Sequence, residues 1–398
     1  MLGSSEAVRG ETGRGMPAFA LTEEQRAYAR QIRELAGREL VPLAERGDEG
    51  HVNRPLLEAM GKHGLLGRLF GTGENQRANA MQLCLLRETL ASVSTEAETA
   101  LALQALGSYP FVLFGDERIR AKYRDGVAKG TIVAAFALSE SEAGSDAAAL
   151  QLRAEPDGDG WRLTGEKTWI SNAPEADVYT VFARTTPDTR AKGITAFVVD
   201  GNAPGLTGEH LDMLAPHAIG RLTFDGVKAE PQDVLGEVDQ GFKIAMRTLD
   251  VLRPSVGAFA VGMAQAALDA ATKHATTRQA FGGRLSDQQA VSHLLAEMAT
   301  RVQASRLLVY AAAAAYDAGA PAAQLTRDAA MAKLFATESA QFVVDAAVQL
   351  HGARALQRGH LLERLYRDVR APRIYEGASE VQRTIIGRSL VQEQEQHG

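Results

Sequence analysis

The hydrophobic pattern of this chain changes its period twice, and this change restricts the fold more than any other feature. From Leu21 to Val133, apolar residues recur at the spacing of a helix. Between Ala134 and Leu235 they form short β-branched and aromatic runs bounded by glycine, aspartate or proline, as strands do. From residue 236 to 398 the helical spacing returns. We therefore expect a mainly α protein with an N-terminal helical domain, a central β domain and a C-terminal helical bundle, preceded by a disordered polar tail at residues 1–20.

Helix signals lie in both outer zones. Thr22 precedes two glutamates and is suited to cap the first helix, because its hydroxyl can accept a free backbone N–H. Residues 291–302 and 331–343 carry apolar side chains at helical spacing. Another helix is expected to begin after Arg253, with Pro254 in its first turn. The absence of strand–helix alternation and of a dinucleotide-binding glycine pattern argues against a Rossmann fold.

The central zone predicts antiparallel strands. Asp157–Gly160 is a cluster of turn-forming residues between strand-like runs and is typical of a hairpin. Further short runs follow at residues 177–185, 194–201 and 221–227. Several short strands separated by turns indicate an antiparallel barrel or sandwich.

Charge and cysteine content narrow the class of protein. The formal net charge of −6 gives no reason to expect nucleic acid or an acidic membrane as a partner. No apolar run approaches the roughly 18 residues that span a bilayer, and the first residues lack the apolar core of a signal peptide. The single cysteine, Cys84, excludes an intrachain disulfide and lies in an apolar helical run, where a buried side chain is expected. A cytoplasmic protein fits these features.

Two polar stretches at the start of the β zone are candidates for ligand binding. The loop "FALSESEAGSDAAAL" carries Ser139, Gly144 and Ser145, whose hydroxyl and backbone N–H groups suit a phosphate or a polar ring edge. A loop of this composition is more commonly a plain turn. Trp169 lies in "GEKTWISNA", where the alternative is a core tryptophan with a satisfied indole N–H.

Two further stretches follow apolar helices. "TRQAFGGRL" places Arg278 near Phe281 and two glycines, a combination that suits a pyrophosphate, although an arginine exposed at a helix end is the simpler reading. "QLHGARAL" is another turn that contains glycine. The nine histidines are scattered and no CxxC, HxxxH or GxSxG motif is present, so we expect neither a metal site nor a serine hydrolase. The side chains therefore offer acid–base chemistry and phosphate binding, but no redox group.

Glu376 stands out in the arginine-rich stretch "RDVRAPRIYEGASEVQR". It is either a surface charge that pairs with Arg373 or Arg383, or a proton acceptor held over a substrate. The residues alone leave both readings open.

Four of these stretches together resemble the acyl-CoA dehydrogenase family. "LSESEAGSD", "WISN", "RQAFGGRLSDQQAVSHLLAEMA" and "RDVRAPRIYEGASEVQR" match its motifs in order and in spacing, over roughly Leu21 to Val391. The resemblance implies an N-terminal helical domain, an antiparallel β barrel or sandwich, and a C-terminal four-helix bundle. It also implies FAD, held between the β domain and the bundle and reaching a neighbouring subunit. The C-terminal helices are long and apolar on more than one side, most clearly the one with Met331, Phe335, Phe342 and Val343, and this pattern predicts a homotetramer.

The resemblance assigns roles residue by residue. For FAD it implies Leu138, Ser139, Ser145, Trp169, Ser171, Arg278, Phe281, Gln289, Gln349, Gly352 and Ala353. For the substrate it implies Ser145, Asp250, Arg253 and Gly377, and for catalysis Glu376.

The activity that the resemblance implies is α,β-dehydrogenation of an acyl thioester. Glu376 would remove the α-proton, the β-hydrogen would pass as a hydride to flavin N5, and an electron-transferring flavoprotein would be the acceptor. An acyl-CoA oxidase, a dehydrogenase that acts on an acyl group bound to a carrier protein, and a non-catalytic acyl-binding subunit are the alternatives. "STEAETALALQAL" aligns with the family's pocket-floor helix and contains no arginine, so a dicarboxylate finds no counter-charge on it.

The chain departs from the family pattern at several positions. Ser141 replaces the usual proline of the first loop, Ala353 a glycine, and Ala378 the usual threonine or serine. Arg68–Gln76 retains little of the family's glycine-rich N-terminal loop. These changes affect the contacts that FAD would make more than they affect the reaction.

Overall fold

The computed structural model describes residues 21–71 and 78–397 and has the expected order of helices, strands and helices. The tail at residues 1–20 and most of the loop at Arg68–Gln76 lie outside the described residues. The N-terminal domain consists of α1 (Glu23–Leu35), α2 (Val41–Ala44), α3 (Arg54–Lys62), α4 (Ala80–Ala91), α5 (Thr95–Phe114) and α6 (Glu117–Lys129). Thr22 caps α1 as predicted, because its hydroxyl accepts the N–H of Gln25 at 3.1 Å while the Gln25 side chain accepts the N–H of Thr22.

The β domain is one eight-stranded sheet with the order β6-β7-β3-β2-β4-β5-β8, in which β1 pairs with β4. The strands are β1 (Ala134–Ala137), β2 (Arg153–Asp157), β3 (Gly160–Ser171), β4 (Val178–Arg184), β5 (Ile194–Asp200), β6 (Leu206–His210), β7 (Ile219–Ala229) and β8 (Val234–Leu235). The predicted hairpin joins β2 to β3, with Asp157 opposite Gly160 and Gly158 at φ 63°. Most pairings are antiparallel as expected, but both β1 and β2 run parallel to β4.

Helix α5 joins the helical domain to the sheet. The Gln104 side chain bonds the backbone on both sides of Val133, donating to the carbonyl of Ile132 at 2.8 Å and accepting the N–H of Ala134 at 2.8 Å. The Thr180 hydroxyl of β4 donates to the carbonyl of Gly107 at 3.0 Å. One hydrophobic core therefore continues from the N-terminal helices into the β domain.

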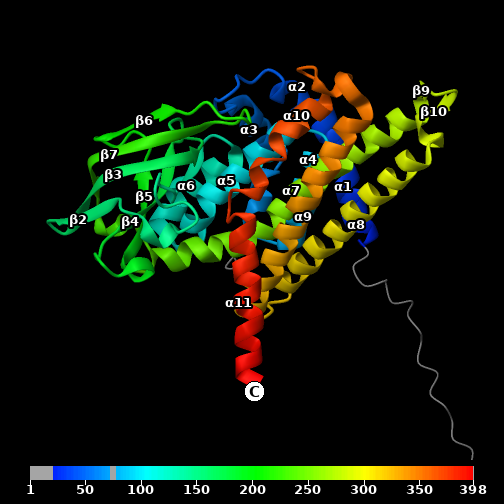
Figure 1. Ribbon diagram of the computed structural model, residues 1–398. Coiled ribbons are helices and arrows are strands. Elements are labelled where there is room, and N and C mark those ends of the chain that lie inside the picture. Colours follow the sequence, from blue (N-terminus) through cyan, green and yellow to red (C-terminus); the bar gives the residue numbers. More distant parts are fainter. Residues whose placement is uncertain (1–20, 72–77, 398) are drawn as a thin grey trace, which may run out of the picture.

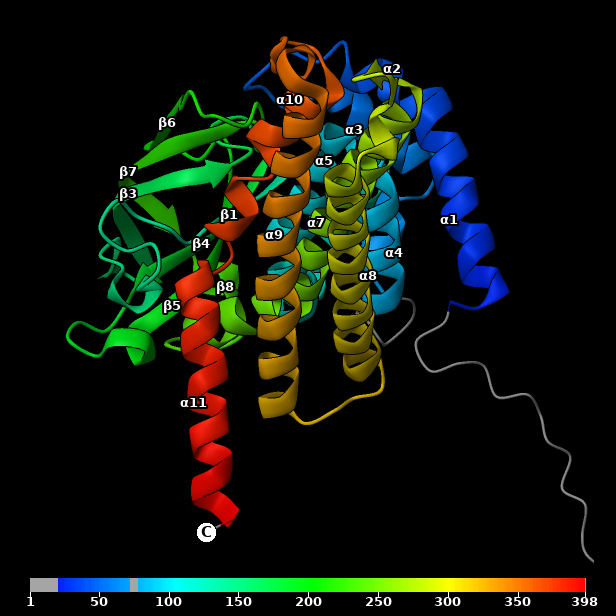
Figure 2. The ribbon, with the colours of Figure 1, turned by 45° about the vertical axis from the view of Figure 1, so that its right-hand side comes forward.

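The C-terminal domain is a bundle of long helices (Figures 1 and 2). Its elements are α7 (Gly241–Thr277), the hairpin β9 (Gln279–Ala280) and β10 (Gly283–Arg284), α8 (Gln289–Asp317), α9 (Ala322–His351), α10 (Leu361–Asp368) and α11 (Ser379–His397). Helices α7, α8 and α9 pack against one another, α4 packs against α7, and α11 packs against α9. The lower part of α11 projects beyond the body of the molecule in both views.

The expected start of a helix after Arg253 is wrong, because α7 already begins at Gly241 and carries Pro254 in its interior. Burial outweighs the lost backbone hydrogen bond here, since the helix is buried on nearly every side around this proline. By length and composition α7 is the one described helix that could cross a membrane, but 83% of its apolar window is buried inside the molecule, as in a core helix.

The close approach of α5 to β1 gives a test of the fold. A Cβ at Gly107 would lie 2.5 Å from the carbonyl carbon of Ala134, so Gly107→Ala should lower the free energy of unfolding by about 1–3 kcal/mol. Gly37→Ala is the matched control, because nothing lies within 4 Å of its added Cβ and alanine favours a helix by about 0.5–1 kcal/mol. Urea denaturation of both variants would measure this. If Gly107→Ala were as stable as the wild type, α5 and β1 would not be packed this closely.

Candidate functional site

The segment that leads into α11 runs between the β domain and α9 (Figures 1 and 2), and Glu376 lies at a turn in this segment, three residues before the helix begins. It adopts the left-handed backbone conformation at φ 51°, and Gly377 follows at φ 94°. A non-glycine residue held in this conformation carries strain of the kind that gathers at functional sites. The Oε2 atom of Glu376 is buried and has no hydrogen-bond partner among the described residues.

The two arginines that would make Glu376 an ordinary surface charge have other partners. Arg373 lies 2.9 Å from Glu338, and Arg383 lies 3.3 Å from Glu380. Within the described residues, the Glu376 carboxylate therefore forms a salt bridge with neither arginine, and this favours a proton acceptor over a surface charge.

Three side chains hold the carbonyl groups of this turn. Arg253 Nε donates to the carbonyl of Glu376 at 3.2 Å. Lys333 Nζ and Gln382 Nε2 donate to the carbonyl of Gly377 at 2.7 and 2.9 Å. Lys333 and Gln382 were not identified from the sequence, although a lysine in the apolar run "AMAKLFA" is a usable signal, since buried lysines are rarely unpaired.

Burial and nearby cations act on the Glu376 carboxyl in opposite directions. Burial raises its pKa, and Arg87, Lys333 and Arg253 lower it. Burial also lowers the pKa of the Lys333 ammonium to about 8, although Glu376 opposes that shift. The net effect is a raised pKa, so this carboxylate is more basic than one in water.

A second buried carboxylate lies within electrostatic range of Glu376. Glu98 on α5 forms an ion pair with Arg87 of α4, which also donates to the Ser255 hydroxyl at 2.6 Å. Burial raises the pKa of Glu98 to about 7 despite the guanidinium, and its Oε2 atom has no described partner. The stretch aligned with the family's pocket-floor helix, residues 94–106, contains no arginine. Arg87 of α4 lies beside it instead and forms an ion pair with Glu98 of this stretch.

The predicted substrate residues gather around the turn, with one exception. Arg253 donates to Asp250 at 3.1 Å, and the Thr326 hydroxyl donates to the other oxygen of Asp250 at 3.1 Å. Arg253 therefore links Asp250 to Glu376. Ser145 is exposed on the loop that follows β1, and no hydrogen bond among the described residues joins its side chain to this group.

At the edge of the β domain, the loop after β1 is tied to the end of β3. Lys167 Nζ donates to the carbonyl of Leu138 at 2.9 Å and to Glu140 at 2.7 Å, and the N–H of Thr168 donates to the carbonyl of Ser139 at 3.0 Å. Trp169 follows in the left-handed conformation at φ 57° and is 47% exposed, so it is not a core tryptophan. Ser171 ends the same strand and is half-buried.

The remaining predicted cofactor residues lie at the far end of the bundle. Arg278, Phe281, Gln289, Gln349, Gly352 and Ala353 are all exposed, and Phe281 is 91% exposed at φ 54°. The rings of His274 and His351 stack with centroids 4.2 Å apart, which brings the end of α7 beside the end of α9. Figure 1 shows this hairpin end on the opposite side of the molecule from the β domain, so one chain does not bring Arg278 to Trp169.

These two groups suit the two ends of a dinucleotide cofactor. The β-domain edge offers a flat, exposed indole and a backbone fixed by Lys167, as a planar ring requires. The bundle end offers exposed guanidinium groups beside an exposed aromatic ring, as a pyrophosphate and its nucleoside require. The residues present thus fit FAD when two chains contribute.

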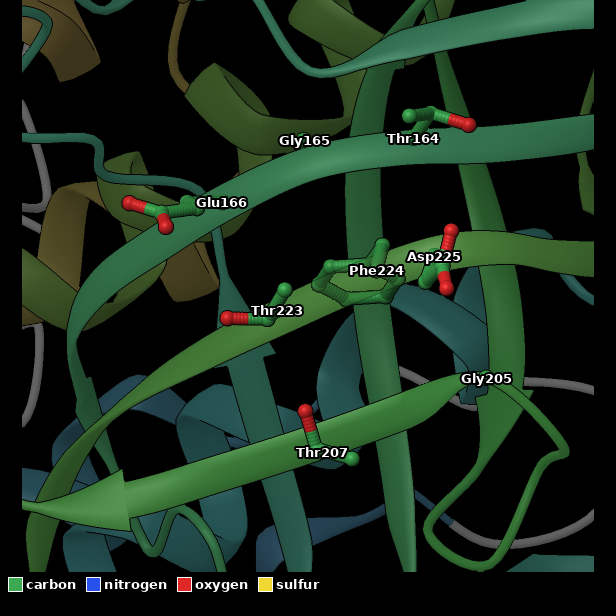
Figure 3. A pocket seen from close by; sticks show the side chains of 8 residues that line it. All are labelled: Thr164, Gly165, Glu166, Gly205, Thr207, Thr223, Phe224 and Asp225. Atoms are coloured by element: carbon green, nitrogen blue, oxygen red, sulfur yellow. The ribbon is translucent and has the colours of Figure 1, made fainter.

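Two surface hollows do not coincide with this site. The first, of about 500 Å³, lies on β3, β6 and β7 and is lined mainly by threonine, glycine and acidic residues (Figure 3). The second, of about 520 Å³, lies between Leu214 of the β domain and the helices α9 and α10, and carries Arg367, Arg370 and Arg373. Neither is lined by a residue predicted to bind cofactor or substrate.

Comparisons with known proteins match most of the chain. Family models for the N-terminal, middle and C-terminal domains of acyl-CoA dehydrogenases match residues 22–131, 135–227 and 239–391. A probable acyl-CoA dehydrogenase of Mycobacterium tuberculosis is 37% identical over 94% of this chain and 97% of its own. The cyclohexane-1-carbonyl-CoA dehydrogenase of Geobacter metallireducens is 32% identical over 94% and 99%.

Solved structures have the same fold. Butyryl-CoA dehydrogenase from Megasphaera elsdenii has a TM-score of 0.86 at 34% identity, covering 94% of this chain and 99% of its own. An FAD complex of PigA has a TM-score of 0.86 at 25% identity, covering 94% and 98%. The fold class expected from the sequence is confirmed.

Lys333 allows a test of the charge balance at the turn. Its pKa is lowered from 10.5 to about 8, so between these values the unfolded chain binds more protons and stability rises with pH. Lys333→Met should lose this rise, about 1–3 kcal/mol in total. Lys243→Met, at an exposed lysine of α7, is the control. Urea denaturation at pH 8 and pH 10.5 measures both, and a Lys333→Met variant that keeps the wild-type rise would contradict the assignment.

Proposed function

The chain belongs to the acyl-CoA dehydrogenase family, and we propose that Glu376 is the base that removes the α-proton of its acyl-CoA substrate. The protein is an FAD-dependent oxidoreductase. The observation that carries the proposal is the buried, unpartnered Oε2 atom of Glu376 in a strained turn. A carboxylate left without a partner at such a position is available to a substrate.

The α-proton of a thioester is weakly acidic, so its removal needs a base stronger than a carboxylate in water. Burial provides this, because it raises the pKa of Glu376. Arg87, Lys333 and Arg253 act against this shift, so the nearby positive charges limit the rise in the pKa. The donors that Arg253, Lys333 and Gln382 direct at the two carbonyls hold the base in one position.

Bound FAD supplies the acceptor for the β-hydrogen, so the redox chemistry belongs to the cofactor. We propose that Leu138, Ser139, Trp169 and Ser171 hold its ring portion from the β domain, and that Ser145 reaches its phosphate or the pantetheine arm of the substrate. In this proposal the bundle end of a second chain holds the other portion with Arg278, Phe281, Gln289, Gln349, Gly352 and Ala353. Asp250, Arg253 and Gly377 then border the acyl group, with Ser145 beside the thioester arm.

We propose a homotetramer in the cytoplasm that passes its electrons to an electron-transferring flavoprotein. The exposed apolar side chains of Phe281, Leu390 and Val391 support the assembly, because they lie on a hairpin and a helix that project from the body. Phe335 of α9 is also exposed, whereas Val343 of the same helix lies in the core. A second chain would cover these side chains and complete the FAD site.

Glu376→Gln should keep bound FAD and lose substrate-dependent bleaching of the flavin by more than a hundredfold, because glutamine keeps the shape but not the basicity. Glu380→Gln, a neighbouring exposed glutamate, is the control and should bleach at the wild-type rate. The measurement is anaerobic stopped-flow absorbance with acyl-CoAs of graded length, branching and ring content, and with acyl carrier proteins.

Each outcome of this experiment has a distinct meaning. Near wild-type bleaching by Glu376→Gln would refute the assignment of the base. Rapid reoxidation of the wild type by O₂ would favour the oxidase. If only acyl groups on carrier proteins bleach the flavin, the substrate is bound to a carrier protein and not to CoA. If no thioester bleaches the flavin, a non-catalytic role is favoured.

Arg278→Ala should lower the ratio of flavin to protein after gel filtration by at least fivefold, because it removes a charge-assisted contact to the pyrophosphate. Arg284→Ala on the same hairpin is the control, since Arg284 already pairs with Asp287. Light scattering on the flavin-loaded wild type should give four times the chain mass of 42.6 kDa. A monomer that holds FAD in a 1:1 ratio would refute both the tetramer and the shared site.

A further inference from the structure

Three metal-ligating side chains meet on the surface where the N-terminal domain joins the β domain. His51 comes from the segment before α3, Glu175 from the loop after β3, and His210 from the end of β6. His51 Nδ1 lies 2.6 Å from Glu175 Oε1, and His210 Nε2 lies 3.3 Å from the same oxygen. All three ligand atoms lie within 4.8 Å of one another, and no other group of histidine, cysteine and acidic residues in the described ranges meets this criterion.

The spacing of these atoms suits a small divalent transition ion. Zinc binds imidazole nitrogen and carboxylate oxygen at about 2.0–2.2 Å, which sets tetrahedral ligand atoms roughly 3.3 Å apart. The His210–Glu175 separation already has this value. The His51–Glu175 contact is a hydrogen bond that has to open by less than an ångström for an ion to enter. Two imidazoles favour zinc, nickel or copper over calcium and magnesium, which prefer oxygen ligands.

The backbone around Glu175 is held by a second set of contacts. Its other carboxylate oxygen accepts the N–H of Val52 at 3.2 Å, and its carbonyl accepts Arg54 Nη2 at 2.9 Å. Arg54 also pairs with Asp177 at 2.9 Å. Supporting bonds of this kind orient ligands and raise metal affinity. They also fix His51 and Glu175 relative to each other, although 124 positions separate them in the chain.

We propose that His51, Glu175 and His210 form a zinc site that joins the N-terminal helical domain to the β domain. The side chains are 53%, 27% and 38% exposed, so water completes the coordination. The site shares no residue with the turn at Glu376 or with the proposed FAD contacts, and its role is structural. A ligand bound only by the folded protein stabilises it, so zinc should hold the two domains together.

The test is isothermal titration of zinc into the FAD-loaded, untagged protein after treatment with a chelator. One equivalent should bind, and His51→Ala, His210→Ala and Glu175→Gln should each weaken binding by at least tenfold. Cobalt should give the visible absorption of a tetrahedral site in the wild type and lose it in these variants. A saturating zinc concentration should raise the thermal midpoint of the wild type only.

Two controls separate this site from other histidines. His293→Ala removes an exposed histidine of α8, and His351→Ala disrupts the stacked rings at the bundle end. Both should bind zinc like the wild type. Zinc affinity that is unaffected by His51→Ala and His210→Ala, or lowered only by His351→Ala, would overturn the proposal. The proposal would also be overturned if the variants of His51, Glu175 and His210 lost the same stability with and without zinc, since the three side chains would then form only an ion pair.

Discussion

A buried carboxylate without a partner is costly, and much of the C-terminal domain is arranged around the one at Glu376. Burial raises its pKa, and three cations from three helices act against that rise, namely Arg87 of α4, Arg253 of α7 and Lys333 of α9. Two of these side chains also bond the backbone of the turn. The same groups thus set the basicity of the carboxylate and its position, and neither property can change without the other.

This arrangement requires the helices to approach closely. A Cβ on Gly262 of α7 would lie 2.4 Å from the carbonyl of Glu88 of α4, and one on Gly257 would lie 2.7 Å from Val309 of α8. Small residues on α7 therefore bring Arg87 and Arg253 to one place. Pro254 is tolerated in the same stretch because the surrounding helices bury it, and the fold gains more from this packing than it loses in one backbone hydrogen bond.

Local signals in the sequence predict local structure, and the features that were not predicted depend on contacts between segments far apart in the sequence. The cap at Thr22, the hairpin at Asp157–Gly160 and the buried Cys84 each depend on a few neighbouring residues, and all three are confirmed. The parallel pairing of β1 with β4 and the partnership of Arg87 with Glu98 depend on how distant segments meet. The hydrophobic periodicity of a sequence does not show which distant segments come into contact. Glu376 was identified only because its neighbours match a family motif, whereas Lys333 lies in an apolar stretch that reads as core.

The separation of the two groups of predicted cofactor residues has a consequence for stability. The β-domain edge with Trp169 and the bundle end with Arg278 lie on opposite sides of one chain, so a single cofactor can contact both only across two chains. Cofactor binding and chain association are then linked, and each strengthens the other by mass action. The exposed ring of Phe281 in a strained conformation fits the proposed linkage, because a second chain and the cofactor would cover the ring and offset the strain. The cations that act on the Glu376 carboxylate all come from the same chain, so the position of this side chain does not require a second chain, whereas the proposed FAD site does.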